Sequence, residues 1–228
     1  LGASPIMSEE PAEAGEMVGL AGGVCLNLGA FTQAQIQQIR TVGQQANAQH
    51  KPLVIDPVAV GAVQYRKQVA TGLLADFHPD VIRGNAGEIA ALADISWQAK
   101  GIDAGEGAGD LVAIAQACAQ KLDCVVILSG PTDIITDGTR VVKVLNGTPL
   151  FQVHVGSGDM LSSIVAAFCA VTPDTFEAAQ TACLVFAAIG QRVVQTVPDV
   201  GAGSFTVHLL DALQSTTVAQ IEAVAAYE

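Results

Sequence analysis

Basic residues are scarce in this sequence. Lys and Arg together number 10 against 22 Asp and Glu, which gives the 228 residues a formal net charge of -12. A surface of this sign repels nucleic-acid backbones and anionic lipid heads. The sequence also has no apolar run of the roughly 18 residues that a membrane-spanning helix needs, and no basic start followed by an apolar signal segment. We therefore predict a cytoplasmic protein that binds neither nucleic acid nor membranes.

Several functional signatures are missing as well. The five cysteines form no C-x-x-C pair, and the four histidines show no H-x-H or H-E-x-x-H spacing. This pattern predicts reduced core thiols and provides no zinc ligand set. The motifs G-x-x-x-x-G-K-S/T, G-x-G-x-x-G and G-x-S-x-G are absent. The sequence thus lacks the signatures of P-loop enzymes, of dinucleotide-binding folds and of α/β-hydrolases. A kinase of another type remains possible.

The sequence does contain a regular alternation of apolar runs and helix-length segments. The runs, rich in Val, Ile and Leu, lie at 24–28, 53–55, 81–82 and 125–128. Nearly continuous apolar strands are typical of a parallel sheet covered by helices on both faces. Half of the residues are hydrophobic, which is enough for one sizeable core. We predict a single domain over residues 1–228, a three-layer α/β/α sandwich with a mostly parallel central sheet.

The second half of the chain predicts a hairpin and then helices. Asp137-Gly138 supplies the positive φ values of a tight turn, so the sheet should end in antiparallel strands at 134–136 and 141–145. A loop with Gly105, Gly107 and Gly109 precedes a predicted helix. Helix-length patterns, most of them rich in Ala, cover 111–121, 160–171, 175–195, 206–213 and 218–225.

The segment Gly156-Ser157-Gly158-Asp159 is the most informative one for chemistry. Its glycines allow a ligand to approach the backbone, and the free amides at a helix start attract a phosphoryl group. Asp159 at the same helix start would stay ionised, orient a hydroxyl group and accept its proton during phosphoryl transfer. The alternative is that Asp159 is only an N-cap residue, a position that Asp favours.

Two other predicted strands end in residues that suit phosphate or metal binding. Arg83 is placed to neutralise a transferring phosphate, although a surface ion pair would explain it equally well. Glu88 either faces Mg²⁺ through its water shell or forms a helix-capping box with Asn85, which is the simpler interpretation. Asp56 is either a turn residue or a second carboxylate for the metal. Ligands bind at the carboxyl edge of open α/β sheets, so these residues predict a site there.

Six motifs follow one another over the whole chain. They read GASPIM at 2–7, DPVAVGA at 56–62, IRGNAGEI at 82–89, TDG at 136–138, GSGD at 156–159 and GAGSF at 201–205. In this order they resemble the hydroxyethylthiazole kinases, ribokinase-like enzymes of thiamine salvage. The resemblance implies ATP- and Mg²⁺-dependent phosphorylation of the hydroxyethyl group of a thiazole alcohol, by a homotrimer whose active sites are shared between subunits.

The resemblance also assigns roles to residues. It implies that Met7 and Gly156 contact the thiazole and that Arg83 and Ser129 contact ATP. Gly158, in the phosphate loop, belongs to the predicted ATP site as well.

This sequence departs from the family in two residues. The family usually has Cys where this chain has Asp159, although Asp is usual in the wider ribokinase-like superfamily. Ser129 stands where Thr is common, which preserves the hydroxyl group. The family's first strand and helix are expected before Leu1.

Three other functions remain open at this point. A sibling kinase for hydroxymethylpyrimidine would share the glycine loop but not the segment 2–7. A nucleotide-dependent NAD(P)H-hydrate dehydratase of the same fold also carries a glycine-rich loop that ends in Asp. A non-catalytic thiazole- or nucleotide-binding protein is the third, and the presence of Asp159, Glu88 and Arg83 together makes it the least attractive.

Overall fold

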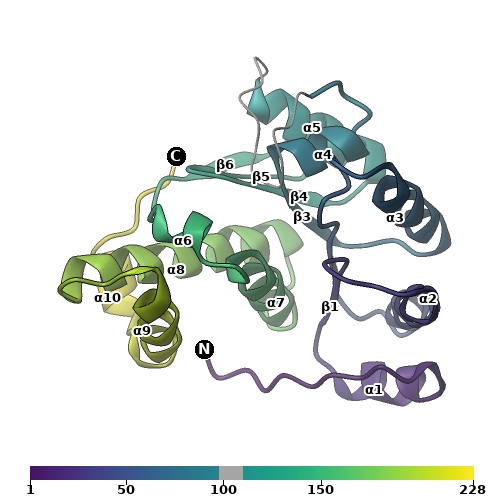
Figure 1. Cartoon of the computed structure of the whole chain (residues 1–228), viewed down its shortest axis with the longest axis horizontal. Helices are drawn as coiled ribbons and strands as arrows, with labels where there is room; N and C mark the ends of the chain where they lie inside the picture. Colours follow the sequence, from purple (N-terminus) through teal and green to yellow (C-terminus); the bar gives the residue numbers. More distant parts are fainter. Residues whose placement is uncertain (98–109) are drawn as a thin grey trace.

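A six-stranded sheet forms the centre of the protein in the computed structural model, which describes residues 1–97 and 110–228 (Figure 1). The strands are β1 (Val24–Asn27), β2 (Leu53–Asp56), β3 (Val81–Asn85), β4 (Val125–Ser129), β5 (Asp133–Thr136) and β6 (Val141–Val144). The strands lie side by side in sequence order. Strands β1 to β4 are parallel to one another, β5 is antiparallel to β4, and β6 is antiparallel to β5. The mostly parallel sheet with an antiparallel end is thereby confirmed. The predicted loop at Gly105 lies outside the described residues.

The helices that connect the parallel strands cover one face of the sheet. They are α2 (Gln33–Ala48), α3 (Gln64–Asp76), α4 (Ala86–Leu92) and α5 (Leu111–Leu122), and a short helix η1 (Pro11–Glu13) with α1 (Ala14–Leu20) packs outside α2. Crossovers between parallel strands are right-handed, so connections that run in one direction across the sheet all reach the same face. Their core includes Leu26, Ile55 and Ile82.

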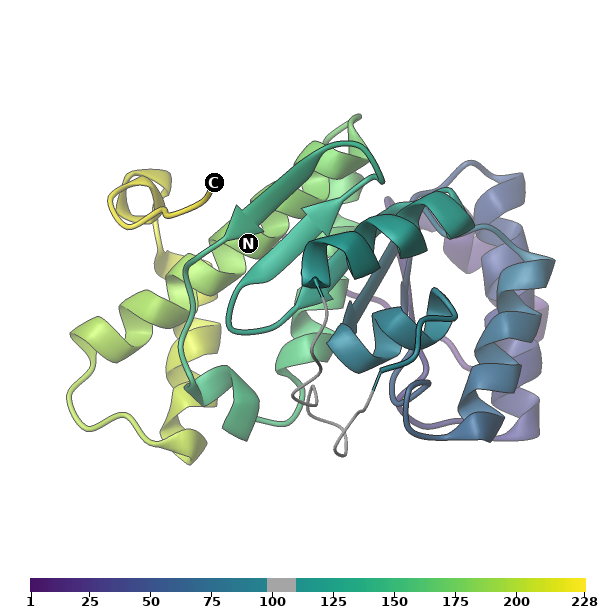
Figure 2. The same ribbon diagram turned by 90° about the horizontal axis from the view of Figure 1, so that it is seen from above.

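The C-terminal helices cover the opposite face. They are α6 (Leu150–Val153), α7 (Ser157–Cys169), α8 (Thr175–Thr196), α9 (Ala202–Ser215) and α10 (Val218–Glu222). Neighbouring strand residues supply the two cores alternately: Ile55 faces the connecting helices, whereas Val54 packs in the core of α7 and α8. This is why the strands read as continuous apolar runs, and it confirms the three-layer α/β/α sandwich. Figure 2 shows the N-terminal and C-terminal helices at opposite ends of the molecule.

Most predicted elements agree with the structure, but some helix boundaries were wrong. α7 begins at Ser157 instead of residue 160, and α9 begins at Ala202 instead of residue 206. Both helices start within glycine-containing segments of low helix propensity, where the tertiary packing decides the boundary. Within the described ranges no helix is long and apolar enough to cross a membrane. The five thiols are free, and all but Cys25 are buried.

Candidate active site

The predicted site residues gather at the carboxyl edge of the sheet. The register places Asn27, the last residue of β1, beside Asp56, the last residue of β2. It likewise places Asn85 of β3 beside Ser129 of β4. Helix α7 contacts both β1 and β2, so Asp159 in its first turn reaches the same edge.

Asp159 is held by Asn27 across the gap between α7 and β1. The Nδ2 atom of Asn27 donates a hydrogen bond of 2.7 Å to Oδ1 of Asp159. The Oδ1 atom of Asn27 accepts one of 2.6 Å from the Gly29 backbone amide, which fixes the orientation of the side-chain amide. Oδ2 of Asp159 accepts no hydrogen bond from the described residues. One carboxylate oxygen is therefore fixed, and the other is available to a substrate.

The alternative that Asp159 caps the helix is wrong. Gly156 occupies the N-cap position, with φ of 103°, and Asp159 lies three residues further along in the first turn. A positive φ of this size favours glycine. Asp159 thus points its carboxylate toward β1 instead of toward the amides of its own helix.

Gly158 allows Arg83 to approach the start of α7. A Cβ atom at position 158 would collide with the guanidinium group of Arg83. The free backbone amides of the helix start therefore lie beside an arginine, and both attract an anion. This arrangement of amides and a guanidinium group is chemically suited to binding a phosphoryl group.

Arg83 forms an ion pair with Asp56, but this pair is not on the surface. Nη1 of Arg83 is 3.4 Å from Oδ2 of Asp56, and the Asp56 side chain is 1% exposed. Ser162, one turn after Asp159, donates a 2.9 Å hydrogen bond to the same oxygen. Burial raises the pKa of Asp56, while Arg83 and Ser162 oppose the rise. The alternatives of a surface ion pair for Arg83 and of a simple turn residue for Asp56 are therefore wrong.

Glu88 forms the capping box that was the simpler interpretation. Its Oε2 accepts a 2.8 Å hydrogen bond from the Asn85 amide, and Oδ1 of Asn85 accepts a 3.0 Å bond from the Glu88 amide. Oε1 of Glu88 accepts a further 2.7 Å bond from the Ala59 amide. Burial raises the pKa of Glu88, and the two amides oppose the rise. Glu88 thus fastens the loop after β2 to the start of α4.

The residues at this edge fit Mg²⁺ only through water. The described residues contain no group of three or more His, Cys, Asp or Glu side chains arranged around a metal position. Oδ1 of Asp56 is the one buried carboxylate oxygen in the described structure without a hydrogen-bond partner. Mg²⁺ keeps several of its waters in proteins, so a water-mediated contact to this oxygen suits it. Asp56 and Glu88 also interact electrostatically across the edge.

The remaining predicted residues lie less centrally. Ser129 is buried and donates a 3.3 Å hydrogen bond to the Gly84 carbonyl oxygen, next to the site. Gly156 has open space on its Cα side. Met7 lies in the extended segment before η1 and is 93% exposed, so this chain does not enclose it.

Three further residues that were not predicted lie at this edge, Asn27, Ser162 and Asp133. Asn27 lies near the end of the predicted strand 24–28, and Ser162 lies one turn after Asp159, so both positions were available as signals. Asp133 accepts a 3.0 Å hydrogen bond from the Gly130 amide. Burial raises the pKa of Asp133 to about 6, and the charge of Arg83 opposes the rise. That shift depends on packing and has no sequence signal.

Comparison with solved structures identifies the fold. A ribokinase-like superfamily protein from Enterococcus faecalis matches with a TM-score of 0.65 at 20% identity, covering 90% of this chain and 67% of that chain. The six-stranded sheet and its two helical layers thus have the ribokinase-like fold.

Closer relatives identify the family. The model of the hydroxyethylthiazole kinase family matches residues 1–219. A hydroxyethylthiazole kinase from Lactiplantibacillus plantarum is 65% identical over 99% of this chain and 86% of the relative. One from Latilactobacillus sakei is 52% identical over 97% of this chain and 83% of the relative. The structure of a hydroxyethylthiazole kinase protein from Pyrococcus horikoshii has a TM-score of 0.88 at 29% identity, covering 100% of this chain and 84% of that chain. The chain belongs to the hydroxyethylthiazole kinase family.

This membership confirms the resemblance drawn from the six motifs. It makes the chain an enzyme that phosphorylates an alcohol with ATP as co-substrate. It also favours hydroxyethylthiazole kinase over the three other functions that the sequence alone left open. These are the hydroxymethylpyrimidine kinase, the NAD(P)H-hydrate dehydratase and the non-catalytic binding protein.

Proposed function

We propose that the site at the carboxyl edge transfers the γ-phosphoryl group of ATP to the hydroxyl group of hydroxyethylthiazole, in thiamine salvage in the cytoplasm. The observation that carries this proposal is the Asn27–Asp159 hydrogen bond beside the glycine turn of α7. It leaves one carboxylate oxygen available next to the backbone amides and the arginine that bind a phosphoryl group.

Asp159 acts as the base in this reaction. Its available oxygen accepts the proton of the hydroxyl group while the alcohol oxygen forms a bond to phosphorus and the bond to ADP breaks. A carboxylate is a weak base, but in a loose transition state the proton leaves late, so position matters more than basicity. Asn27 supplies the position, because it holds Oδ1 of Asp159 at 2.7 Å.

Arg83, Gly158 and Ser129 bind the nucleotide in this proposal. The amides at the start of α7 and the guanidinium group of Arg83 attract the transferring phosphoryl group from one side. Arg83 is kept in place by the buried Asp56, which also balances its charge when no phosphate is bound. Gly156 and Met7 would contact the thiazole.

Mg²⁺ completes the proposed site. When bound, it would neutralise the charge on the phosphates of ATP in a protein whose own net charge is -12. Asp56 would hold it through water at its unpartnered Oδ1, and Glu88 would add negative charge nearby.

We also propose that the enzyme is a homotrimer with shared active sites. Four apolar side chains next to the glycine turn are exposed, namely Val153, Val155, Val207 and Leu210. A 3.0 Å hydrogen bond between His154 and Thr206 joins the two segments that carry them. A second subunit that covers these residues would lie beside Gly156, and a neighbour at Met7 would complete the thiazole site.

A coupled assay for ADP release tests the proposed function. With ATP, Mg²⁺ and hydroxyethylthiazole we expect turnover and a phosphorylated thiazole product. Turnover with hydroxymethylpyrimidine but not with the thiazole would contradict the proposal, and so would dehydration of NAD(P)H hydrate as the only activity.

A further inference from the structure

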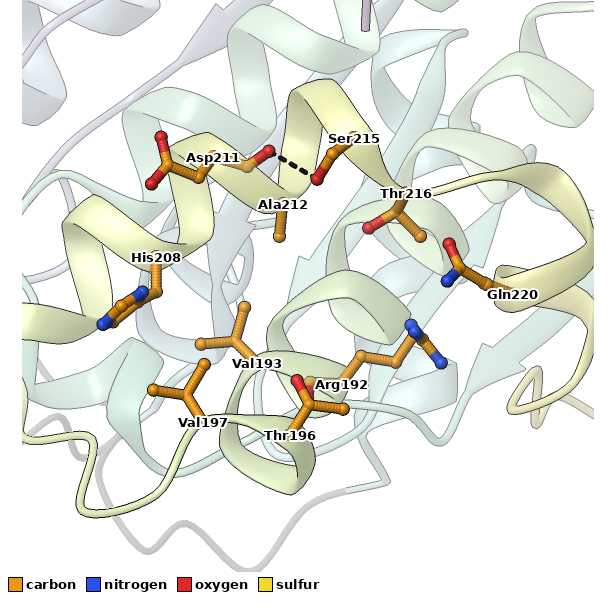
Figure 3. Close-up of a pocket in the computed structure, with 10 residues that line it drawn as sticks. All are labelled: Arg192, Val193, Thr196, Val197, His208, Asp211, Ala212, Ser215, Thr216 and Gln220. Carbon is orange, nitrogen blue, oxygen red and sulfur yellow. Dashed lines mark hydrogen bonds between the residues drawn. The ribbon is translucent and has the colours of Figure 1, made fainter.

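A pocket of about 400 Å³ lies between α8, α9 and α10, and it shares no residue with the candidate active site (Figure 3). Val193, Val197 and Ala212 give it an apolar surface in the middle. The guanidinium group of Arg192 points toward Thr216 and Gln220 at one end, while His208 and Asp211 lie at the other. We refer to this cavity as the α8–α9 pocket.

Arg192 is exceptional in its lack of a partner. Every other lysine and arginine in the described ranges donates to a carboxylate, a side-chain oxygen or a backbone carbonyl. Arg192 forms no such bond with the described residues, and its Nε atom is shielded from solvent. The chain carries 22 acidic residues, so an unpaired arginine is not explained by a shortage of acids. A buried donor without an acceptor is unfavourable.

A second donor faces the same space. Oε1 of Gln220 accepts a 2.9 Å hydrogen bond from the Thr217 amide as part of the capping box of α10. This bond fixes the side-chain amide so that its nitrogen lies on the side of Arg192 (Figure 3). Thr216 adds a hydroxyl group at the same end of the pocket. The side-chain nitrogens of Arg192 and Gln220 therefore face the same space, and neither side chain donates a hydrogen bond to a described residue.

We propose that the α8–α9 pocket binds a small anionic molecule with an apolar body. Its carboxylate or phosphoryl oxygens would accept hydrogen bonds from Arg192, Gln220 and Thr216, because a guanidinium fork matches either group. Its apolar body would cover Val193, Val197 and Ala212. Asp211 repels an anion at the opposite end, so the ligand binds in one orientation.

Two probes distinguish the possible anions. Isothermal titration of the full-length chain with phenyl phosphate and with benzoate compares a phosphoryl group and a carboxylate on the same apolar ring. The titrations are done with saturating ADP, so that the proposed ATP site at the glycine turn of α7 is occupied. We expect saturable binding of at least one probe and weaker binding of inorganic phosphate, which lacks the apolar body.

Arg192→Gln is the decisive variant. We expect it to weaken binding at least tenfold, whereas Arg40→Gln removes the same charge from an exposed pair with Asp76 and should leave binding unchanged. Thr216→Val provides a second test if Arg192→Gln fails to fold. Equal binding by all variants, an equal loss in Arg40→Gln, or no binding by the parent chain would overturn the proposal. A change of oligomeric state in Arg192→Gln without ligand binding would assign the arginine to a subunit contact and would overturn it too.

Discussion

Asp159 is the residue on which the proposed chemistry depends most directly. Its carboxylate is not used as a helix cap, and its Oδ1 is bound by Asn27. The structure therefore separates its chemical role from a role in folding. A substitution that keeps its shape should affect the rate and spare the stability.

We predict that Asp159→Asn lowers kcat by roughly a hundredfold or more, the range expected for loss of a general base. The amide oxygen can still accept the hydrogen bond from Asn27, so the melting temperature should stay near that of the parent. Asp159→Cys should retain a reduced rate. Steady-state kinetics and thermal unfolding measure both effects, and an Asn variant as fast as the parent would exclude Asp159 as the base.

We assign Asn27 a positioning role, because its side chain bonds the proposed base Asp159 and the Gly29 amide. We predict that Asn27→Leu lowers kcat by about tenfold while the KM for ATP changes little, since the contact orients Asp159 and leaves the phosphate loop intact. Asn47→Leu is a matched control, because it removes an amide at the end of α2 that bonds His78 just before β3, at the amino edge of the sheet opposite the site. If KM for ATP rises instead and kcat is kept, Asn27 does not act through Asp159.

Asp133 should make the stability of the protein depend on pH. Its pKa is raised by burial to about 6, above the roughly 3.9 of an unfolded Asp. Between these values the folded state binds more protons than the unfolded state, so stability falls as pH rises from about 4 to 6 and then stays level. Asp133→Asn keeps an acceptor for the Gly130 amide and removes the charge.

We therefore predict that Asp133→Asn melts at a higher temperature than the parent at pH 7, and that the difference disappears below about pH 4. Thermal unfolding of both proteins between pH 4 and 8 measures this. A difference that is constant over the whole range would show that the charge of Asp133 is not responsible.

At the scale of secondary-structure elements, the start of α7 combines two glycines with different functions. Gly156 provides the positive φ of the N-cap, whereas Gly158 leaves room for Arg83. Because Gly158 leaves this room, a single methyl group added at position 158 should disturb the position of Arg83.

We predict that Gly158→Ala raises the KM for ATP about tenfold, because the new Cβ displaces the guanidinium group of Arg83 from the helix start. Gly72→Ala is the matched control. Gly72 lies inside α3 with open space around its Cα, so the change should leave the kinetics unchanged and stabilise the protein by up to about 1 kcal/mol. Equal KM values in both variants would place Arg83 outside the ATP site.

The elements were largely predictable from the sequence. Val54 and Ile55 show why: both faces of the sheet are covered, so each strand is apolar throughout and visible as a run. The start of α7 was not predictable, because Ser157 and Gly158 are poor helix formers that are held helical by packing. In the site, Asp56 and Arg83 were found as strand-end residues, whereas the Asn27–Asp159 contact depends on how α7 lies against β1.

Glu88 also has a contact that could not be predicted from the sequence. A capping box was expected from its spacing to Asn85, but the bond from Ala59 comes from a loop 29 residues earlier. Glu88 therefore uses both carboxylate oxygens for backbone amides, and a Gln at this position would leave one amide without an acceptor. The sequence pattern alone suggests that Gln would be tolerated.

At the scale of the whole molecule, the exposed apolar residues beside the glycine turn predict its assembly. We expect a trimer in sedimentation equilibrium at micromolar concentration, and we expect Val155→Asp to shift it to monomers with loss of turnover, because Val155 is 96% exposed here and would be buried in the proposed interface. Val171→Asp, at an exposed valine after α7, is the control. A parent protein that stays monomeric, or a monomeric Val155→Asp variant with full activity, would contradict the shared site.

The order of the strands in the sheet equals their order in the chain. Each strand therefore pairs with the one synthesised just before it, and such short-range pairing favours folding while the ribosome is still adding residues. Asn27, Asp56 and Arg83 emerge with the first three strands, but Asp159 follows only after the sixth. A nascent chain can thus complete its sheet before its proposed base has been added, and we expect the enzyme to gain its activity late in its own synthesis.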